Sequence, residues 1–297
     1  MLELGLRLPA DTQDRMREHA QHGATLLDVA IEDTERVWGW QDSSLSLPVL
    51  GTSGAQLWMK VRSRPVMDVI PKQWAGVAAA ERIMSDSNLA VLRPVLVDQE
   101  TWTGGGWAYQ AELTSRLPVR AFSPSRVAPE WMADLPVAWW TNLRAALDGI
   151  QELASAELTA IAWQESAARS VGVVDPASWV PSHGDVCAAN LGAADSDRPV
   201  LFDWDYLGLG PRYIDAAGLF LSSLDTPDVA ARVRAHFGDQ LDSPAGLYAQ
   251  SVIAAHWTKR FKSGEHVDLG LTLRTYMRTI EEQAPLTADV GTTQRAT

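Results

Sequence analysis

The most informative segment of the chain spans residues 182–205 and reads SHGDVCAANLGAADSDRPVLFDWD. Residues 199–202 predict a short strand, and the acidic cluster just before them predicts a turn. A β-hairpin built on this turn would bring Asn190 and Asp203 close together, beside the loop that carries Asp185. Three oxygen-bearing side chains from one short segment are therefore expected to converge.

Such a trio of side chains suits phosphoryl transfer, in which catalysis consists mainly of positioning and charge neutralisation. Asp185 would accept or orient the attacking hydroxyl, and Asn190 and Asp203 would hold Mg²⁺ against the nucleotide phosphates. Hard oxygen donors, with no His or thiolate in ligand positions, favour Mg²⁺ over zinc. The cofactors expected are ATP or GTP, together with Mg²⁺.

The order and spacing of these residues resemble the aminoglycoside phosphotransferase family, part of the protein-kinase-like superfamily of small-molecule kinases. The sequence His183-Gly-Asp185, the Asn five residues later and the apolar strand ending in Asp203-Trp match the family pattern at each position. The resemblance implies an α+β fold of two lobes, an antiparallel-sheet N-lobe and a helical C-lobe. It also makes Asp185 and His183 the catalytic residues.

Two further acids accompany this pattern. Tyr213-Ile-Asp215 resembles a family element in which the Asp, on a following helix, braces the catalytic loop, so Asp215 is predicted to support that loop. Asp205 stands where protein kinases have a glycine. It is predicted either to contact the metal or its ligands, or to cap a helix at the surface.

The front of the chain predicts a mostly antiparallel sheet with one helix packed on it. Strand-favouring residues between 35 and 61 are interrupted by turns, and Thr103-Gly-Gly-Gly106 is typical of a hairpin turn rather than a phosphate loop. The fold implied by the resemblance needs a lysine on the third strand and a glutamate on the adjacent helix. Lys60 fits the first position. Glu81, on a helix predicted to begin near Pro71, fits the second, and Glu100 and Glu112 stay open as alternatives.

No Gly-x-Gly-x-x-Gly motif marks the expected phosphate position. The turn Gln41-Asp-Ser43-Ser44 is predicted to replace it by offering backbone N–H and hydroxyl donors. By analogy with the fold, the adenine is expected near the hinge, against backbone groups from Gln110 through Glu112 to Leu113.

The resulting division is an N-terminal nucleotide-binding lobe over residues 1–112, a hinge over 113–118 and a helical C-terminal lobe over 119–297. Residues 1–30 would form a polar helical extension of the first lobe. The second lobe would contain the catalytic loop and the acceptor site. Its long helical segments are predicted at 136–156, 226–237, 244–262 and 267–283.

Composition limits the partners. The 297 residues include 25 basic and 37 acidic ones, a formal charge of −12 that argues against a nucleic-acid partner. No run approaches the ~20 apolar residues needed to cross a bilayer, and the first residues lack a signal-peptide pattern. The single Cys187 excludes an intrachain disulfide. We expect a cytoplasmic monomer or homodimer with a small-molecule acceptor and no contact with membranes.

No residue decides which acceptor is used. Acidic residues such as Asp205 would suit a cationic aminoglycoside or another amine or sugar, and Trp139-Trp140 could stack on a sugar or belong to the core. Choline, homoserine, another metabolite or another antibiotic stays open, and an antibiotic acceptor would make this a resistance enzyme. Two other classes remain as alternatives, a metal-dependent phosphoesterase and a non-catalytic nucleotide-binding protein.

Overall fold

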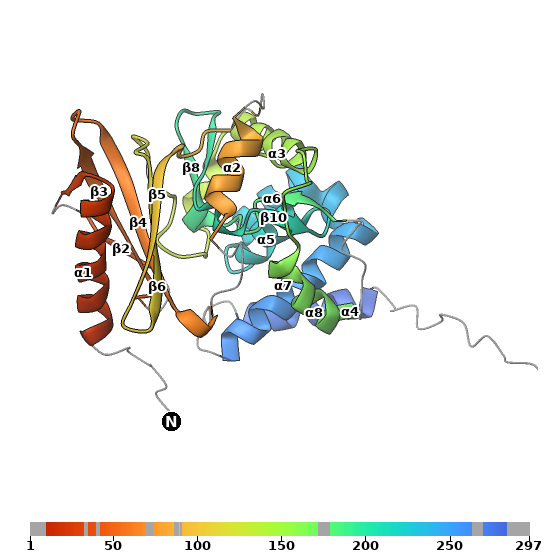
Figure 1. Cartoon of the computed structure of the whole chain (residues 1–297). Helices are drawn as coiled ribbons and strands as arrows, with labels where there is room; N and C mark the ends of the chain where they lie inside the picture. Colours follow the sequence, from red (N-terminus) through yellow and green to blue (C-terminus); the bar gives the residue numbers. More distant parts are fainter. Residues whose placement is uncertain are drawn as a thin grey trace, which may run out of the picture.

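The computed structural model describes residues 10–32, 35–39, 42–68, 74–85, 89, 91–171, 179–262 and 270–283. Figure 1 shows two lobes, one built on an antiparallel sheet and a larger one built mainly of helices. The predicted α+β class is therefore confirmed. Gln41, the expected helix start at Pro71 and the polar tail from Ala284 lie outside the described residues.

The first lobe is built on a sheet with strand order β1-β3-β4-β6-β5, in which β2 also pairs with β3 and all neighbours are antiparallel. The strands are β1 (Val29–Ile31), β2 (Val37–Trp38), β3 (Ser44–Gly51), β4 (Gln56–Pro65), β5 (Leu96–Gly104) and β6 (Trp107–Ser115). Gly105 and Gly106, both with positive φ, form the turn between β5 and β6. The glycine-rich segment is therefore the predicted hairpin turn.

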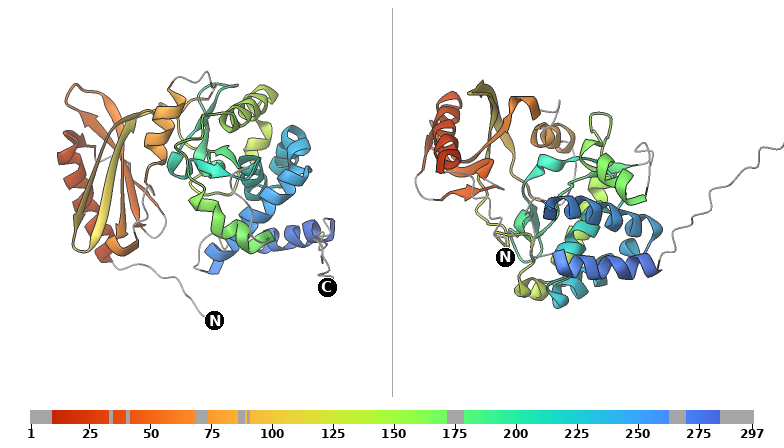
Figure 2. Two further views of the ribbon diagram at one scale, coloured as in Figure 1. Left: turned by 45° about the vertical axis from the view of Figure 1, so that its right-hand side comes forward. Right: turned by 90° about the horizontal axis from the view of Figure 1, so that it is seen from below.

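The two faces of this sheet differ because side chains alternate along each strand. On the outer face, buried residues such as Met59 and Val61 pack against one face of α1 (Ala10–Leu26), which contributes Met16, Ala20 and Ala24. Figure 2 shows the same arrangement from below, with α1 on the side of the sheet away from the helical lobe. The predicted polar extension is thus an amphipathic helix that covers the sheet.

The helix α2 (Gly76–Met84) packs with the other lobe, although it lies between two strands of the sheet in sequence. Its buried side chains, including Val77, Ala80 and Met84, belong to the hydrophobic core of the helical lobe. A Cβ at Gly76 would lie 2.2 Å from the carbonyl oxygen of Trp204, so this close approach requires glycine. The helix packed on the sheet is α1 rather than α2.

The second lobe contains most of the helices and two small strand pairs. Its helices are α3 (Val137–Gln151), α4 (Ile161–Val171), α5 (Ile214–Ser222), α6 (Pro227–Leu241), α7 (Pro244–Lys262) and α8 (Gly270–Gln283). Its strands are β7 (Val180–Ser182), β8 (Leu191–Ala193), β9 (Pro199–Leu201) and β10 (Gly208–Gly210), in the antiparallel pairs β7–β10 and β8–β9. Short 3₁₀ turns of this lobe lie at η3 (Glu130–Asp134), η5 (Ala188–Asn190) and η6 (Trp204–Tyr206), and another, η2 (Val66–Asp68), follows β4 in the first lobe.

Trp139, Trp140 and Leu92 are all fixed within this lobe. Trp139 and Trp140 are fully buried in the core, so neither can stack on an acceptor. Leu92 is bonded to β9 through the Leu201 N–H and the Pro199 carbonyl, which fixes this residue to the strand preceding Asp203. Among the described residues, no helix combines the length and the apolar character needed to cross a bilayer.

Candidate active site

The loop between β7 and η5 is held by α5. The Asp215 carboxylate accepts hydrogen bonds from the backbone N–H groups of His183 (2.9 Å) and Gly184 (2.7 Å). Gly184 has a φ of 81°, and a Cβ there would lie 2.7 Å from the Tyr206 carbonyl oxygen, so glycine is required. Asp215 therefore fixes the loop that presents Asp185.

His183 is buried beneath this loop. Its side chain has no exposed surface, its Nε2 is hydrogen bonded to the Phe202 carbonyl at 2.8 Å, and its ring meets Trp204 edge-on. This burial corrects the predicted catalytic role of His183, because a substrate cannot reach the ring. His183 is a positioning residue that ties the Asp185 loop to the chain just before Asp203.

Asp185 is held by two donors. The amide nitrogen of Asn190 donates to the Asp185 carboxylate at 2.9 Å and to its backbone carbonyl at 2.8 Å, and Arg126 forms an ion pair with the same carboxylate. Burial alone would raise the pKa of Asp185, but the Arg126 guanidinium holds that pKa below its usual value. The carboxylate is therefore ionised near neutral pH and able to accept a proton.

The predicted hairpin is formed by β8 and β9 and brings Asn190 next to the chain before Asp203. The Phe202 N–H donates to the Asn190 carbonyl at 2.9 Å. Asp203 follows immediately in the left-handed conformation, with a φ of 56°, which Asp tolerates better than bulkier residues do. This turn of the backbone directs the Asp203 carboxylate toward the sheet lobe, where Lys60 meets it.

Lys60 extends from β4 toward this turn. Its ammonium group donates to Asp203 at 2.9 Å and to Asp205 at 2.6 Å. Burial would lower the pKa of Lys60, but the two carboxylates raise it above its usual value, so the amine stays charged. The structure thus brings Lys60, predicted from the first lobe, to Asp203, predicted from the second.

A second cation, Arg62, shares this position and was not predicted from the sequence. It lies two residues after Lys60 on β4, with its side chain 7% exposed, and forms ion pairs with Glu112 and with Asp205, the latter at 2.7 Å. Burial would raise the pKa of Asp205, yet Arg62 and Lys60 hold it far below its usual value. We call Lys60, Arg62, Glu112, Asp203 and Asp205 the interlobe cluster.

Glu81 does not reach Lys60. Its carboxylate instead accepts hydrogen bonds from Arg93 at 2.8 Å, from the Ser85 hydroxyl at 2.8 Å and from the Leu96 N–H at 3.3 Å. The physical reason is the packing of α2 against the helical lobe, which keeps this helix away from β4. Glu112, directly opposite Lys60 in the β4–β6 pairing, is the glutamate of the interlobe cluster.

Ser43 and Ser44 lie at the edge of the same sheet. Ser44 begins β3 and pairs with Arg62 of β4, and the Ser63 N–H donates to the Ser43 carbonyl at 2.9 Å. The two serines are therefore next to the Arg62 end of the interlobe cluster. Their predicted contact with phosphates stays a prediction.

The prediction for the adenine contact needs a correction. β6 lies between β4 and β5, and its residues 110–113 pair with both strands, so their backbone groups are engaged within the sheet. The side chains of Gln110 and Glu112 are buried on the inner face, whereas Leu113 packs in the core beneath α1. A base could bond the backbone only beyond the end of β6.

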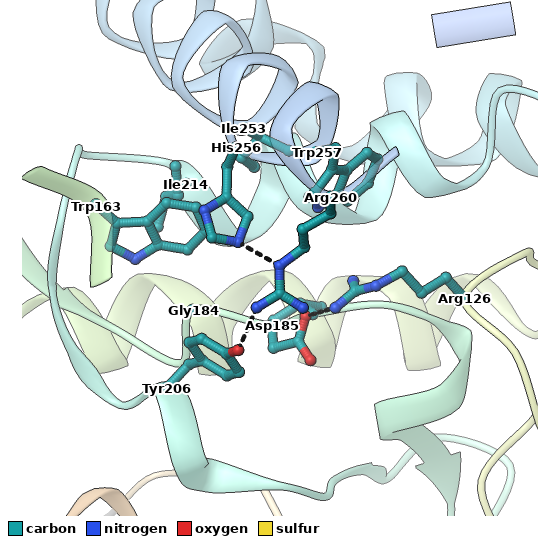
Figure 3. Close-up of a pocket in the computed structure, with 12 residues that line it drawn as sticks. Arg126, Trp163, Gly184, Asp185, Tyr206, Ile214, Ile253, His256, Trp257 and Arg260 are labelled. Atoms are coloured by element: carbon teal, nitrogen blue, oxygen red, sulfur yellow. Dashed lines mark hydrogen bonds and ion pairs between the residues drawn. The ribbon is translucent and has the colours of Figure 1, made fainter. Parts of the chain in front are cut away.

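A small pocket opens beside Asp185 within the helical lobe (Figure 3), and we call it the Asp185 pocket. Its polar lining includes Arg126, Tyr206, His256 and Arg260. Arg260 donates to His256 at 2.9 Å and to the Tyr206 hydroxyl at 2.6 Å. The remaining wall is aromatic and aliphatic and consists of Trp163, Val186, Ile214, Ile253 and Trp257 together with the backbone at Gly184 and Gly218.

The oxygen ligands offered by Asp203 and Asn190 fit a magnesium ion bound together with phosphates. No group of three or more His, Cys, Asp or Glu side chains that could hold a metal occurs in the described parts of the chain. Mg²⁺ usually takes only one or two carboxylates from a protein and completes its shell with phosphate and water oxygens. The Asp203 carboxylate and the amide oxygen of Asn190 could supply such a small number of protein ligands. The amide nitrogen of Asn190 donates to Asp185.

Solved structures with related architectures identify the class of fold. An aminoglycoside phosphotransferase, APH(4)-Ia, in a ternary complex with ADP and hygromycin B has a TM-score of 0.62 and 11% sequence identity, over 92% of this chain and 99% of that one. An amicoumacin kinase in complex with AMP-PNP and Ca²⁺ has a TM-score of 0.59 and 12% identity, over 94% and 97% of the two chains. The choline kinase LicA from Streptococcus pneumoniae has a TM-score of 0.53 and 12% identity, over 91% and 100%. The chain therefore has a protein-kinase-like fold.

The family is indicated by the sequence of the second lobe. Residues 116–249 match the model of the phosphotransferase enzyme family, a range that includes Asp185, Asn190, Asp203 and Asp215. None of the curated proteins matches the sequence significantly. The predicted resemblance to this family, and with it the predicted class of enzyme, is confirmed.

Proposed function

We propose that this chain is an ATP-dependent, Mg²⁺-requiring kinase that transfers a phosphoryl group to a hydroxyl of a small molecule. The observation that supports this most strongly is the convergence of Asp185, Asn190 and Asp203 from one segment with Lys60 from the other lobe. Solved structures of similar fold in complex with AMP-PNP or ADP support the choice of nucleotide. A cytoplasmic location, where ATP and Mg²⁺ are available, is part of the proposal.

The transfer step follows from the position of Asp185. The acceptor oxygen would form a bond to the γ-phosphorus while the bond from that phosphorus to the β,γ-bridging oxygen breaks, and its electron pair leaves with ADP. The hydroxyl proton would pass to the Asp185 carboxylate, which Arg126 keeps ionised, and from there to solvent. Asn190 would orient Asp185 through the hydrogen bond that it donates.

The interlobe cluster would neutralise the nucleotide phosphates. Asp203 and the amide oxygen of Asn190 would hold Mg²⁺, whose charge stabilises the phosphate oxygens when it is bound. Lys60, whose ammonium group lies 2.9 Å from the Asp203 carboxylate, would bind the phosphates on that metal. Ser43 and Ser44 would add donors from the sheet edge, and the base would lie beyond the end of β6.

Two variants test this assignment. Asp203→Ala should lose Mg²⁺-dependent ATP binding, measured by calorimetry with and without the metal, because the main metal ligand is gone. Asp185→Ala should bind MgATP with nearly unchanged affinity but lose turnover by about 10²-fold to 10⁴-fold, the usual contribution of a general base, measured as ADP release.

The matched control is Asp195→Ala, which removes a carboxylate from the same segment where the side chain is 56% exposed. It should behave like the wild type in both assays. Near-normal rates in both Asp203→Ala and Asp185→Ala would contradict the proposal. MgATP binding without phosphorylation of any acceptor would instead favour a non-catalytic nucleotide-binding protein.

A further inference from the structure

Lys60 is held by two carboxylates that differ in their surroundings and in their proposed roles. The Asp203 carboxylate lies 2.9 Å from the ammonium group and its side chain is 38% exposed, whereas the Asp205 carboxylate lies 2.6 Å away and its side chain is 18% exposed. In the proposed function Asp203 is a ligand of Mg²⁺, so Lys60 would share that carboxylate with a divalent cation that repels it. Asp205 is the partner that Lys60 would keep.

The partners of Lys60 differ from those of the corresponding lysine in protein kinases, which is held by a glutamate of the adjacent helix. Here the glutamate of that helix, Glu81, forms its ion pair with Arg93. In the described part of the chain, both ion-pair partners of Lys60 are aspartates of the helical lobe. The position of the lysine therefore depends on the second lobe.

Asp205 is itself fixed by a second cation. The Arg62 guanidinium lies 2.7 Å from Asp205 Oδ2, the same oxygen that accepts the hydrogen bond from Lys60. Arg62 is nearly completely buried, and its other ion pair is with Glu112, whose side chain is buried too. Because a buried charge that loses its partner is strongly destabilising, these pairs restrict the carboxylate to one orientation. The chain of ion pairs Glu112–Arg62–Asp205–Lys60 links β6 and β4 of the sheet lobe to η6 of the helical lobe.

The helix α2 fixes the backbone of Asp205. A Cβ at Gly76, the first residue of α2, would lie 2.2 Å from the carbonyl oxygen of Trp204 and 2.7 Å from that of Asp205, so the helix begins directly against η6. The buried side chains of α2 belong to the core of the same lobe as η6. The helix thus supports the residue that holds Lys60, although its own glutamate does not reach the lysine.

We infer that Asp205 is the positioning residue of Lys60, in the role that protein kinases give to a helix glutamate, and that Arg62 and Glu112 orient the Asp205 carboxylate. This inference rests on the proposed kinase function. Asp205 follows Asp203 by two residues, so one short turn of the chain would place both the metal ligand and the lysine that binds the phosphates. Lys60 would then point toward the phosphates only while η6 is in contact with β4.

The test measures what Lys60 contributes to MgATP binding when its partner is changed. The affinity of the full chain for MgATP is measured by calorimetry, which needs no acceptor and whose fitted stoichiometry reports the folded fraction. In the wild type, Lys60→Met should lower the affinity by about 10-fold to 100-fold, the effect of one hydrogen bond between charged groups. In the Asp205→Asn background the same substitution should lower it by less than about 3-fold, because Lys60 is no longer held there. Comparing the two steps cancels the direct repulsion between Asp205 and the phosphates.

Three further backgrounds make the test specific to Asp205. Asp205→Glu keeps the charge, so Lys60→Met should have an intermediate effect there, and this background provides the same test if the amide variant is unstable. In Glu81→Gln, Lys60→Met should keep its full effect, because Glu81 pairs with Arg93. The matched control is Asp197→Asn, an exposed aspartate in the turn between β8 and β9, which should also keep the full effect. Because each comparison is made within one background, a general loss of stability does not mimic the coupling.

The failures of the two proposals are distinguishable. If Lys60→Met lowers the MgATP affinity equally in the wild type and in Asp205→Asn, the inference is overturned while the proposed role of Lys60 stands. A reduced effect in the Glu81→Gln background would also overturn it, since the helix glutamate would then hold the lysine. If the wild type binds no MgATP, or if Lys60→Met leaves its affinity unchanged, the proposed phosphate contact of Lys60 fails and this inference falls with it.

Discussion

The interlobe cluster and the Asp185 pocket are two buried charged regions that share one chain segment, yet their charged groups are arranged differently. Among the described residues the cluster holds two cations and three carboxylates, whereas in the pocket Arg126 pairs with Asp185 and Arg260 is hydrogen bonded to His256 and Tyr206. Because uncompensated buried charge is costly, an excess of carboxylates favours a cationic ligand. The cluster therefore suits the proposed metal-bound nucleotide, whereas the pocket positions the proposed base.

The largest effect is expected from removing a cation from the interlobe cluster. Arg62→Met would leave Glu112 without its ion-pair partner and would leave Asp205 with Lys60 alone. Breaking a buried pair on one side should lower the free energy of unfolding by about 3–5 kcal/mol, measured by urea denaturation. The double variant Arg62→Met/Glu112→Leu should recover part of this loss, because no buried charge is then left unpaired at residue 112.

The control for this effect is Arg82→Met, which removes an ion pair with Glu157 whose side chains are 54% and 57% exposed. It should change the free energy of unfolding by less than about 1 kcal/mol. Equal losses in the Arg62 and Arg82 variants would show that the interlobe cluster is not a compensated buried network.

Removing a cation from the Asp185 pocket should change the pH dependence of kcat/KM. Arg126→Met removes the cation that opposes the effect of burial on the pKa of Asp185, so that pKa should rise. Because Asp185 must be ionised to accept a proton, the acid limb of the profile of kcat/KM against pH should move upward by about one to three pH units. Arg198→Met, which removes an exposed ion pair with Asp195, is the control and should leave the acid limb in place.

A smaller effect is expected at Asp215, whose carboxylate holds the loop that carries Asp185. Asp215→Asn keeps one acceptor oxygen but turns an amino group toward one of the two N–H donors at His183 and Gly184. The cost of one unsatisfied buried donor is about 1–3 kcal/mol, and we expect kcat to fall about 10-fold while the KM for ATP changes little. The exposed Asp225→Asn is the control, and a variant whose KM for ATP alone changed would contradict the bracing role.

The smallest effect, at most about 1.4 kcal/mol for a change of one pH unit, concerns acid stability through His256. Its pKa is lowered from about 6.5 to about 3 in the folded protein, so between these values the unfolded chain binds a proton that the folded chain does not. The free energy of unfolding should therefore fall with falling pH by up to about 1.4 kcal/mol per pH unit from this residue. His256→Gln should remove that part of the slope in urea unfolding at pH 4 to 7, while His22→Gln on α1 should keep it.

The residues that could be predicted from the sequence are those whose neighbours in the chain place them. Asp185, Asn190 and Asp203 lie within one short segment closed by a hairpin, so local turn chemistry was sufficient to bring them together. Lys60 was predicted because the family resemblance calls for a lysine on the third strand and the sequence places Lys60 on such a strand. The prediction that Glu81 pairs with Lys60 was wrong because the sequence of a helix does not indicate which lobe the helix packs against.

The unpredicted residues had weaker signals. Arg62 follows Lys60 at a spacing of two on a strand and so shares its face. His256 and Arg260 share a helix face at a spacing of four. Neither pattern indicates a site until the opposite lobe or loop is known. Arg126 lies in an irregular segment, where no period applies. The apolar stripe of Met16, Ala20 and Ala24 in α1 could have been found, since their spacing of four is typical of a packed helix.

The packing of α2 has a consequence for how the protein opens. Since Val77, Ala80 and Met84 belong to the core of the helical lobe and Leu92 is bonded to β9, α2 and Leu92 are expected to unfold cooperatively with that lobe, despite their place between strands of the sheet. In native-state hydrogen exchange, the described amides of α2 should then exchange with the free energy of opening measured for α3 and α5, and not with that of β3 and β4.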